Sequence, residues 1–208
     1  MAISRNDAQA RFSEYFPPLR RAMIEARTQM EGSIAEIRHT LRSGTLAGIM
    51  HDLTVFHARR TFAGIKGVYF THNRGLFLVH IGDEAIIRFK KFDRRMRTRS
   101  TLTRQARMLN NPHVQLAMIG MPVEAERFTA GYRLDESQSA MVGMYFTQPD
   151  GLGCEWWLKM DDETGVAAQI ITVAAAAAPM SPVKLKKKAQ SQTGVASDDD
   201  AGTARTAR

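Results

Sequence analysis

The lysines and arginines of this sequence are the residues whose number and spacing most directly indicate a binding site, one for anions. Residues 90–107 contain eight Lys or Arg side chains and a single acid, Asp93. Such a run attracts polyphosphates by releasing their counterions, and the planar Arg guanidinium matches phosphate or carboxylate oxygens in pairs. The candidate anion- or nucleic-acid-binding residues are Arg88, Lys90, Lys91, Arg94, Arg95, Arg97, Arg99, Arg104 and Arg107. The alternative is an ordinary solvated basic surface whose charges pair with the acidic residues 161–163.

The run begins at the end of a strand predicted over residues 85–91. Side chains alternate along a strand, so Arg88 and Lys90 share one face while the residues between them point to the core. Two adjacent cations repel each other. We therefore expect their face to be open to solvent, to a ligand or to a carboxylate partner.

A supporting cluster of three residues is predicted beside these two cations. Asp93 follows the strand directly and is the first candidate partner. Asp135 ends a later strand that also carries Tyr132, and it is the second candidate. Gly131 in that strand leaves room for another backbone or a bulky side chain to approach closely.

The order of helix, three strands, helix and strand invites a comparison with metal-dependent nucleases of the PD-(D/E)xK type. In these enzymes an Asp and a Glu-x-Lys on adjacent strands hold Mg²⁺ and position water. Asp83, Glu84 and Lys90 are the candidate catalytic residues here. The Glu-x-Lys spacing is missing, because Arg88 stands where the carboxylate should be. A divergent nuclease is thus the enzymatic alternative.

Other kinds of site lack their signatures. The six histidines show no metal-ligand spacing, and a single cysteine, Cys154, excludes an internal disulfide and a Cys-rich zinc cluster. The sequence contains neither a Gly-rich phosphate loop nor a Gly-x-Ser-x-Gly nucleophile elbow. We expect no bound metal and no cofactor.

The first elements that must position these residues are helices. Apolar residues recur at spacings of three and four, which predicts helices over residues 6–15, 19–41 and 45–62. The proline pair at 17–18 is expected to end the first of them, since proline has no amide hydrogen. A short basic helix is predicted over residues 94–109, or from Ser100 onward.

After residue 67 the apolar period changes to two, which indicates strands separated by tight turns. Strands are predicted at residues 68–72, 76–81, 85–91, 128–134, 140–147 and 155–160. The predicted fold class is α+β, with N-terminal helices packed on a mostly antiparallel five- to six-stranded sheet and one inserted basic helix. We divide the chain into an N-terminal helical region (1–44), an α+β core domain (45–179) and a disordered basic tail (180–208).

Composition limits the class of protein. The chain has 208 residues, of which 44% are apolar and 24% charged, as is ordinary for a globular protein. Its net charge is +8, and the tail contributes +3 of this from six basic and three acidic residues. No apolar run approaches the ~18 residues needed to cross a bilayer, and the first twenty residues lack the apolar stretch of a signal peptide. We expect a cytoplasmic protein that does not contact membranes.

Three short segments and a later tryptophan together resemble a family of uncharacterised bacterial proteins. The segments are IRFKKFD (residues 87–93), TRQ (103–105) and AGYRLD (130–135), followed by Trp156 or Trp157. The resemblance covers roughly residues 45–165. In that family the gene often lies beside one for an XRE-type helix-turn-helix protein fused to an ImmA/IrrE metallopeptidase domain, as in toxin–antitoxin or phage-defence gene pairs. The resemblance implies a protein partner of this type, and it supplies no catalytic residues.

The leading hypothesis is a component of a toxin–antitoxin or phage-defence module that binds a protein partner. It would also use its basic face on DNA, RNA or nucleotide phosphate. The alternatives are the divergent nuclease and a non-enzymatic interaction protein that docks on an acidic protein surface.

Overall fold

The computed structural model describes residues 3–73, 75–99, 103–111 and 124–160 of the chain. The predicted tail at residues 180–208 lies outside these ranges, as does the end of the predicted core domain. Within the described part, no helix is both long enough and apolar enough to span a membrane.

The described residues form three N-terminal helices, a six-stranded sheet and one later helix, which confirms the predicted α+β fold class. The helices are α1 (Arg5–Phe12), α2 (Phe16–Ile34), α3 (Ser43–Thr61) and α4 (Arg104–Asn110), and 3-10 turns are found at Ser13–Tyr15 and Arg38–Thr40. The strands are β1 (Val68–Asn73), β2 (Leu76–Ile81), β3 (Ala85–Phe92), β4 (Glu126–Leu134), β5 (Met141–Asp150) and β6 (Gly153–Lys159). Each overlaps one of the six predicted strands.

The strands lie in the sheet in their sequence order, from β1 to β6. Neighbouring strands are antiparallel except for β3 and β4, which run parallel from Ala85 opposite Glu126 to Phe92 opposite Arg133. A parallel pair needs a crossover connection, and the chain between these two strands, with α4, provides it. The carboxyl ends of β3 and β4 therefore meet at the same end of the sheet.

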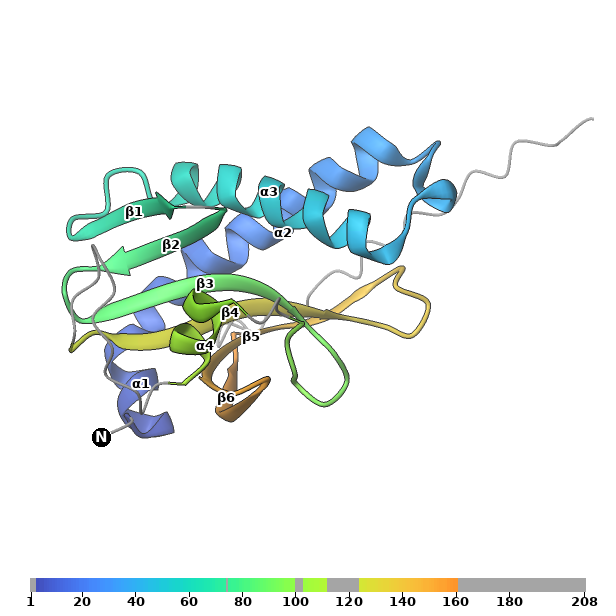
Figure 1. The fold of residues 1–208 in the computed structure, drawn as a ribbon. Helices are drawn as coiled ribbons and strands as arrows, with labels where there is room; N and C mark the ends of the chain where they lie inside the picture. Colours follow the sequence, from blue (N-terminus) through green and yellow to red (C-terminus); the bar gives the residue numbers. More distant parts are fainter. Residues whose placement is uncertain (1–2, 74, 100–102, 112–123, 161–208) are drawn as a thin grey trace, which may run out of the picture. The chain divides into compact units, whose positions relative to one another are not determined.

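Helices α1, α2 and α3 lie on one face of the sheet, and α4 lies on the other (Figure 1). The helix-covered face carries Ile87 and Phe128, which are buried in one core with Phe12 of α1. We call the opposite face the second face. It carries Ile86, which packs on Leu109 of α4. Alternation along β3 then places Arg88, Lys90 and Phe92 on the second face as well.

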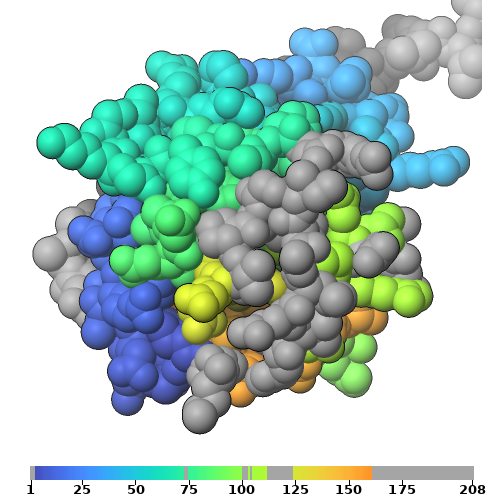
Figure 2. All heavy atoms as spheres, turned by 60° about the vertical axis from the view of Figure 1, so that its left-hand side comes forward, coloured from blue at the N-terminus to red at the C-terminus, as the bar shows by residue number. Residues whose placement is uncertain are grey.

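The amino-terminal helix α1 is fastened to the sheet at the beginning of β3. Arg11 of α1 forms an ion pair of 2.9 Å with Glu84 in the turn between β2 and β3. The Phe12 ring meets Phe128 edge to face at a centroid distance of 5.0 Å. Figure 2 shows α1 (blue) lying against this turn (green). Helix α1 thus packs against the amino end of β3, whereas the carboxyl end of β3 continues into loop 93–99.

Two predicted helix boundaries were wrong. Pro17 and Pro18 do not end a helix but form the first turn of α2, where no intrahelical amide donor is needed. That helix ends at Ile34, earlier than the predicted residue 41. The signal for the early end is weak, because apolar residues continue at helical spacing beyond it.

The predicted basic helix was also wrong over its first half. Residues 94–99 form turns rather than helix, and α4 begins only at Arg104, with the Thr103 hydroxyl capping it through the amide of Ala106 at 3.1 Å. Residues 100–102, which include the alternative start at Ser100, lie outside the described part. Asp93 explains the missing helix, because its carboxylate accepts the amides of Arg95 and Arg97 and closes a tight turn.

Close approach at Gly131 was predicted from the sequence and is confirmed. An ideal Cβ on this residue would lie 2.1 Å from the Lys90 carbonyl oxygen and 2.6 Å from the Phe92 ring. No side chain fits in that space. The absence of one lets β3 and β4 pair and lets Phe92 lie over the strand.

Gly131→Ala is expected to lower the free energy of unfolding by about 3 kcal/mol, the upper end of the cost of overpacking a buried position. Gly48→Ala is the matched control, since a Cβ at this exposed position of α3 meets nothing within 4 Å. The control is expected to gain about 0.5–1 kcal/mol from helix propensity. Urea unfolding of both variants measures the difference, and equal stabilities would contradict the close approach.

Candidate anion-binding surface

The candidate site lies where the carboxyl ends of β3 and β4 meet. Two loops leave the sheet there: residues 93–99 follow β3, and residues 135–140 join β4 to β5. We call the cations gathered here the cationic end, and they are Arg27, Arg38, Lys91, Arg94, Arg95, Arg97, Arg99 and Arg133. The acids among them are Glu31, Asp93, Asp135 and Glu136. Within the described ranges, eight cations against four acids give this end of the sheet an excess of positive charge.

Loop 93–99 is held in a fixed conformation. The Asp93 carboxylate accepts the amides of Arg95 and Arg97 at 2.8 and 2.9 Å and pairs with the Arg97 guanidinium at 2.8 Å. Burial acts to raise the pKa of Asp93, but these hydrogen bonds outweigh it and hold that pKa below its ordinary value. The amide of Thr98 then donates to the Leu152 carbonyl at 2.7 Å, which fastens the loop to the turn before β6.

The four arginines of this loop are all exposed. Arg94 pairs with Glu136 across the two loops, and Arg97 pairs with Asp93. Among the described residues, Arg95 and Arg99 have no carboxylate partner. Exposed ion pairs contribute only about 0–1 kcal/mol. A polyanion can therefore displace Glu136 from Arg94 at little cost.

Aromatic side chains lie beside the loop on the second face. Met96 is buried with Phe92 and Tyr145, and the Phe92 and Tyr145 rings meet edge to face at 6.4 Å. Tyr145 also contacts Trp157 at 5.6 Å. The Trp157 side chain is 45% exposed, which is high for a tryptophan packed on a sheet. The Arg133 guanidinium lies 5.5 Å from the centre of the Tyr145 ring.

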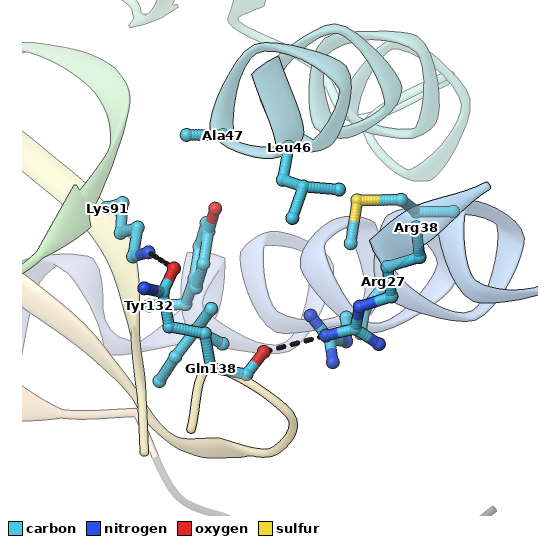
Figure 3. Close-up of a pocket in the computed structure, with 9 residues that line it drawn as sticks. Arg27, Arg38, Leu46, Ala47, Lys91, Tyr132 and Gln138 are labelled. Atoms are coloured by element: carbon cyan, nitrogen blue, oxygen red, sulfur yellow. Dashed lines mark hydrogen bonds between the residues drawn. The ribbon is translucent and has the colours of Figure 1, made fainter. Parts of the chain in front are cut away.

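On the helix-covered side, the cations hold loop 135–140. Figure 3 shows Arg38 donating to the Gln138 carbonyl at 2.7 Å, and Lys91 donating to the Gln138 side-chain oxygen at 2.9 Å. Arg27 donates to the Ser139 carbonyl. Gln138 has a φ of 58°, a left-handed conformation that is uncommon outside glycine. Tyr132 lines the same pocket, whose free space is about that of one water molecule.

The charges around this pocket act on one another. Burial lowers the pKa of Lys91, and the neighbouring Arg27 and Arg99 lower it further. Burial also raises the pKa of Tyr132 to about 12, so this phenol is neutral at physiological pH. The pocket is too narrow for a small-molecule substrate, and its cations serve to position the loop.

Of the three environments expected for Arg88 and Lys90, open solvent does not hold at Arg88. Arg88 is 3% exposed, so the second face is not open to solvent there. Its Nε donates to the Thr129 hydroxyl at 2.9 Å, and burial lowers its pKa to about 10. Lys90 is half-buried, and its pKa is lowered by burial and by Arg88.

The predicted carboxylate partners of this pair bind elsewhere. Asp93 is engaged by its own loop. Asp135 accepts the amides of Ser139 and Ala140 and the hydroxyls of Ser137 and Ser139, and so closes loop 135–140. Tyr132 lies on the helix-covered face rather than beside Arg88. The supporting cluster is therefore three separate features and not one site.

The candidate nuclease residues are not brought together. Asp83 and Glu84 lie in the turn before β3, while Lys90 lies six residues along that strand, which is a separation of about 20 Å. Glu84 is paired with Arg11. Over the described ranges, no three His, Cys, Asp or Glu side chains lie close enough together to hold a metal ion. The geometry gives this alternative no support.

The two remaining predicted cations lie on α4. Arg107 is exposed in the last turn of that helix, and the side chain of Arg104 lies outside the described part. Sequence reasoning missed Arg27 and Arg38, since nothing local relates them to a sheet end over fifty residues away. It also gave Trp157 no role, although its place between Trp156 and Leu158 on a strand indicates an outward side chain.

The acid stability of the protein is expected to depend on Asp135. Hydrogen bonds from Ser137, and from Ala140 and Ser139, lower its pKa from 3.8 to about 2. The ionised form therefore stabilises the fold fully above pH 4, and that contribution disappears as the pH falls through 2. Asp135→Asn should lose less stability than the wild type between pH 4 and pH 2, although it starts from a lower value at pH 7.

The measurement is the thermal midpoint at pH 5, 4, 3 and 2 for the wild type and the variant. Asp52→Asn, a change at an exposed position on α3, serves as the control and should follow the wild-type curve. Parallel curves for wild type and Asp135→Asn would show that this carboxylate is not held as the hydrogen bonds indicate.

Comparisons with protein-family models, with curated proteins and with solved structures found no match to this chain. A functional conclusion therefore depends on the geometry and charge of the cationic end.

Proposed function

We propose that this protein binds nucleic acid through the cationic end, chiefly by contacts with backbone phosphates. One observation carries the proposal: the exposed arginines of loop 93–99 are fixed to the sheet beside an exposed tryptophan. A fixed loop loses little conformational entropy on binding. The backbone positions of its arginines are thus fixed before binding, unlike those of a flexible basic segment.

The distribution of the exposed arginines favours contacts with a chain of phosphates over binding of a single small anion. The exposed arginines are spread over a loop and not gathered around a cavity, which suits a chain of phosphates. Neutralising phosphates releases condensed counterions, so such binding weakens steeply as salt is added. Phosphate contacts of this kind position a protein without selecting a base sequence.

Trp157 gives the proposal a preference for single-stranded regions. A half-exposed indole beside cations offers a flat surface on which an unpaired base stacks. Arg133, which lies over the neighbouring Tyr145, adds a cation next to that surface. Bases in a duplex are already stacked and do not reach it. We therefore propose single-stranded RNA or DNA as the favoured ligand.

The resemblance to proteins of toxin–antitoxin and phage-defence gene pairs adds a protein partner to this proposal. A component of such a module would bind the product of a neighbouring gene and act on nucleic acid together with it. Co-expression with an adjacent XRE-type gene, followed by co-purification, tests the partner separately from nucleic-acid binding.

Arg95→Ala and Arg99→Ala are each expected to flatten the salt dependence of binding. For single strands the slope of log K against log salt should fall by about 0.7 for each phosphate contact removed. Lys66→Ala is the matched control, since this exposed lysine precedes β1 at the opposite end of the sheet. Fluorescence anisotropy with a labelled oligonucleotide at several salt concentrations measures the slopes.

Two outcomes would contradict the phosphate contacts. One is no salt-dependent binding by the wild type, and the other is an equal effect of all three substitutions. Binding to an acidic protein but not to an oligonucleotide, with the same dependence on Arg95 and Arg99, would favour the docking alternative instead.

Trp157→Ala is expected to weaken binding of a single-stranded oligonucleotide by about 1–3 kcal/mol, the typical contribution of one stacked base. Trp157→Phe keeps an aromatic surface and should retain most of the affinity. The thermal midpoint of each variant confirms that it is folded. Equal weakening by both substitutions, or none by either, would show that no base stacks on this side chain.

A further inference from the structure

Arg88 is a buried cation for which the described part of the chain provides no counterion. Its side chain is 3% exposed, and its one hydrogen-bond partner among the described residues is the Thr129 hydroxyl, at 2.9 Å from Nε. No carboxylate in the described ranges pairs with it. The two Nη groups of the guanidinium are thus left without a protein acceptor there.

Lys90 places a second positive charge beside the first. It follows Arg88 on the same face of β3, and it is half-buried. Among the described residues it forms no ion pair. Arg88 and burial both lower the pKa of Lys90, so each cation raises the cost of keeping the other charged. Of the undescribed stretches, residues 100–102 and 112–123 contain no Asp or Glu, and the acids of residues 161–208 are Asp161, Asp162, Glu163 and Asp198 to Asp200.

A buried guanidinium beside a half-buried ammonium, neither with a carboxylate partner among the described residues, is unfavourable unless something compensates for it. Burial without a partner costs several kcal/mol for each ion, and an apolar side chain of similar volume would be more stable at this position. The Thr129 hydroxyl orients the guanidinium through Nε and leaves both Nη groups free to donate to a ligand. A guanidinium with two free Nη donors binds two oxygens of one oxyanion.

We propose that Arg88 and Lys90 bind a single phosphate group on the second face of the sheet, with Thr129 as the positioning residue. Two cations match the charge of a phosphate monoester or inorganic phosphate, which is about −1.5 to −2 at neutral pH. A phosphodiester carries only one negative charge. The ligand is therefore a terminal phosphate, supplied either by free phosphate or by the 5′-phosphorylated end of a nucleic acid.

The site goes beyond the proposed function, because it binds one dianion and does not need the exposed arginines of loop 93–99. Its test is the thermal midpoint of the full chain in phosphate, compared with sodium chloride of the same ionic strength. At phosphate about a hundredfold above its dissociation constant, the midpoint of the wild type should rise by roughly 5–10 °C.

Arg88→Met is the decisive variant. In phosphate-free buffer it should melt at or above the wild-type midpoint, since an apolar side chain replaces an unpaired charge. Phosphate should no longer raise its midpoint beyond the chloride control. Lys66→Met, an exposed change at the other end of the sheet, should keep the full phosphate effect.

Three outcomes would overturn the site: no phosphate effect on the wild type, the same phosphate effect in Arg88→Met, or a clearly lower midpoint of that variant without phosphate. The last would show that Arg88 has a counterion within the chain. If Arg88→Met does not fold, Lys90→Met replaces it, and it should weaken phosphate binding at least fivefold in a ³¹P NMR titration. An unchanged affinity would equally overturn the proposal.

Two oligonucleotides distinguish the sources of the phosphate. If the ligand is a nucleic-acid end, a 5′-phosphorylated strand should bind the wild type more tightly than the same strand with a 5′-hydroxyl, and Arg88→Met should remove the difference. If the ligand is free phosphate, both strands bind equally while phosphate still raises the midpoint. Loss of salt-dependent binding in Arg95→Ala and Arg99→Ala bears on the proposed function alone and leaves this site intact.

Discussion

The contact between the Phe92 ring and the bare backbone at Gly131 is the constraint on which the rest of the site depends. β3 and β4 approach so closely there that a Cβ would lie 2.1 Å from the Lys90 carbonyl oxygen. Phe92 can therefore lie over β4, where it meets Met96 and Tyr145. Because Met96 packs on Phe92 and Tyr145, loop 93–99 is held against the sheet instead of extending into solvent.

Both loops at the cationic end are closed in the same way, by an aspartate at or just past the end of a strand. Asp93 and Asp135 each accept backbone amides of the loop that follows. This use of the carboxylates has an electrostatic consequence. Asp135 has only backbone amides and serine hydroxyls as partners among the described residues, and Asp93 pairs with no arginine there other than Arg97. The loops are therefore rigid, and the described part of the surface keeps more cations than acids.

Two positions on β3 that lie three residues apart place cations in different environments. Lys91 faces the helices, where it donates to Gln138 and helps to hold a loop. Arg88, three residues earlier, lies on the second face and is buried. Its one hydrogen-bond partner among the described residues is the Thr129 hydroxyl. The first cation is satisfied by the protein. The second has free donors, and this difference separates a structural role from a binding role within one strand.

The strands and the fold class followed from local information, because the period of apolar residues and the turn residues around 68–92 act over a few positions. The close approach at Gly131 was also visible, since a glycine within a strand often marks a place where a neighbouring group comes close to the backbone. The pairing of charges was not visible. Asp93 was expected to meet Lys90 but turns to Arg97, and Arg27 reaches Ser139 across 112 residues of sequence. The face of the sheet on which each cation lies, and the residues that cover it, are set by the tertiary structure. The free energy of a charged side chain depends on these surroundings and not on its neighbours in sequence, so only the tertiary structure determines which charges pair.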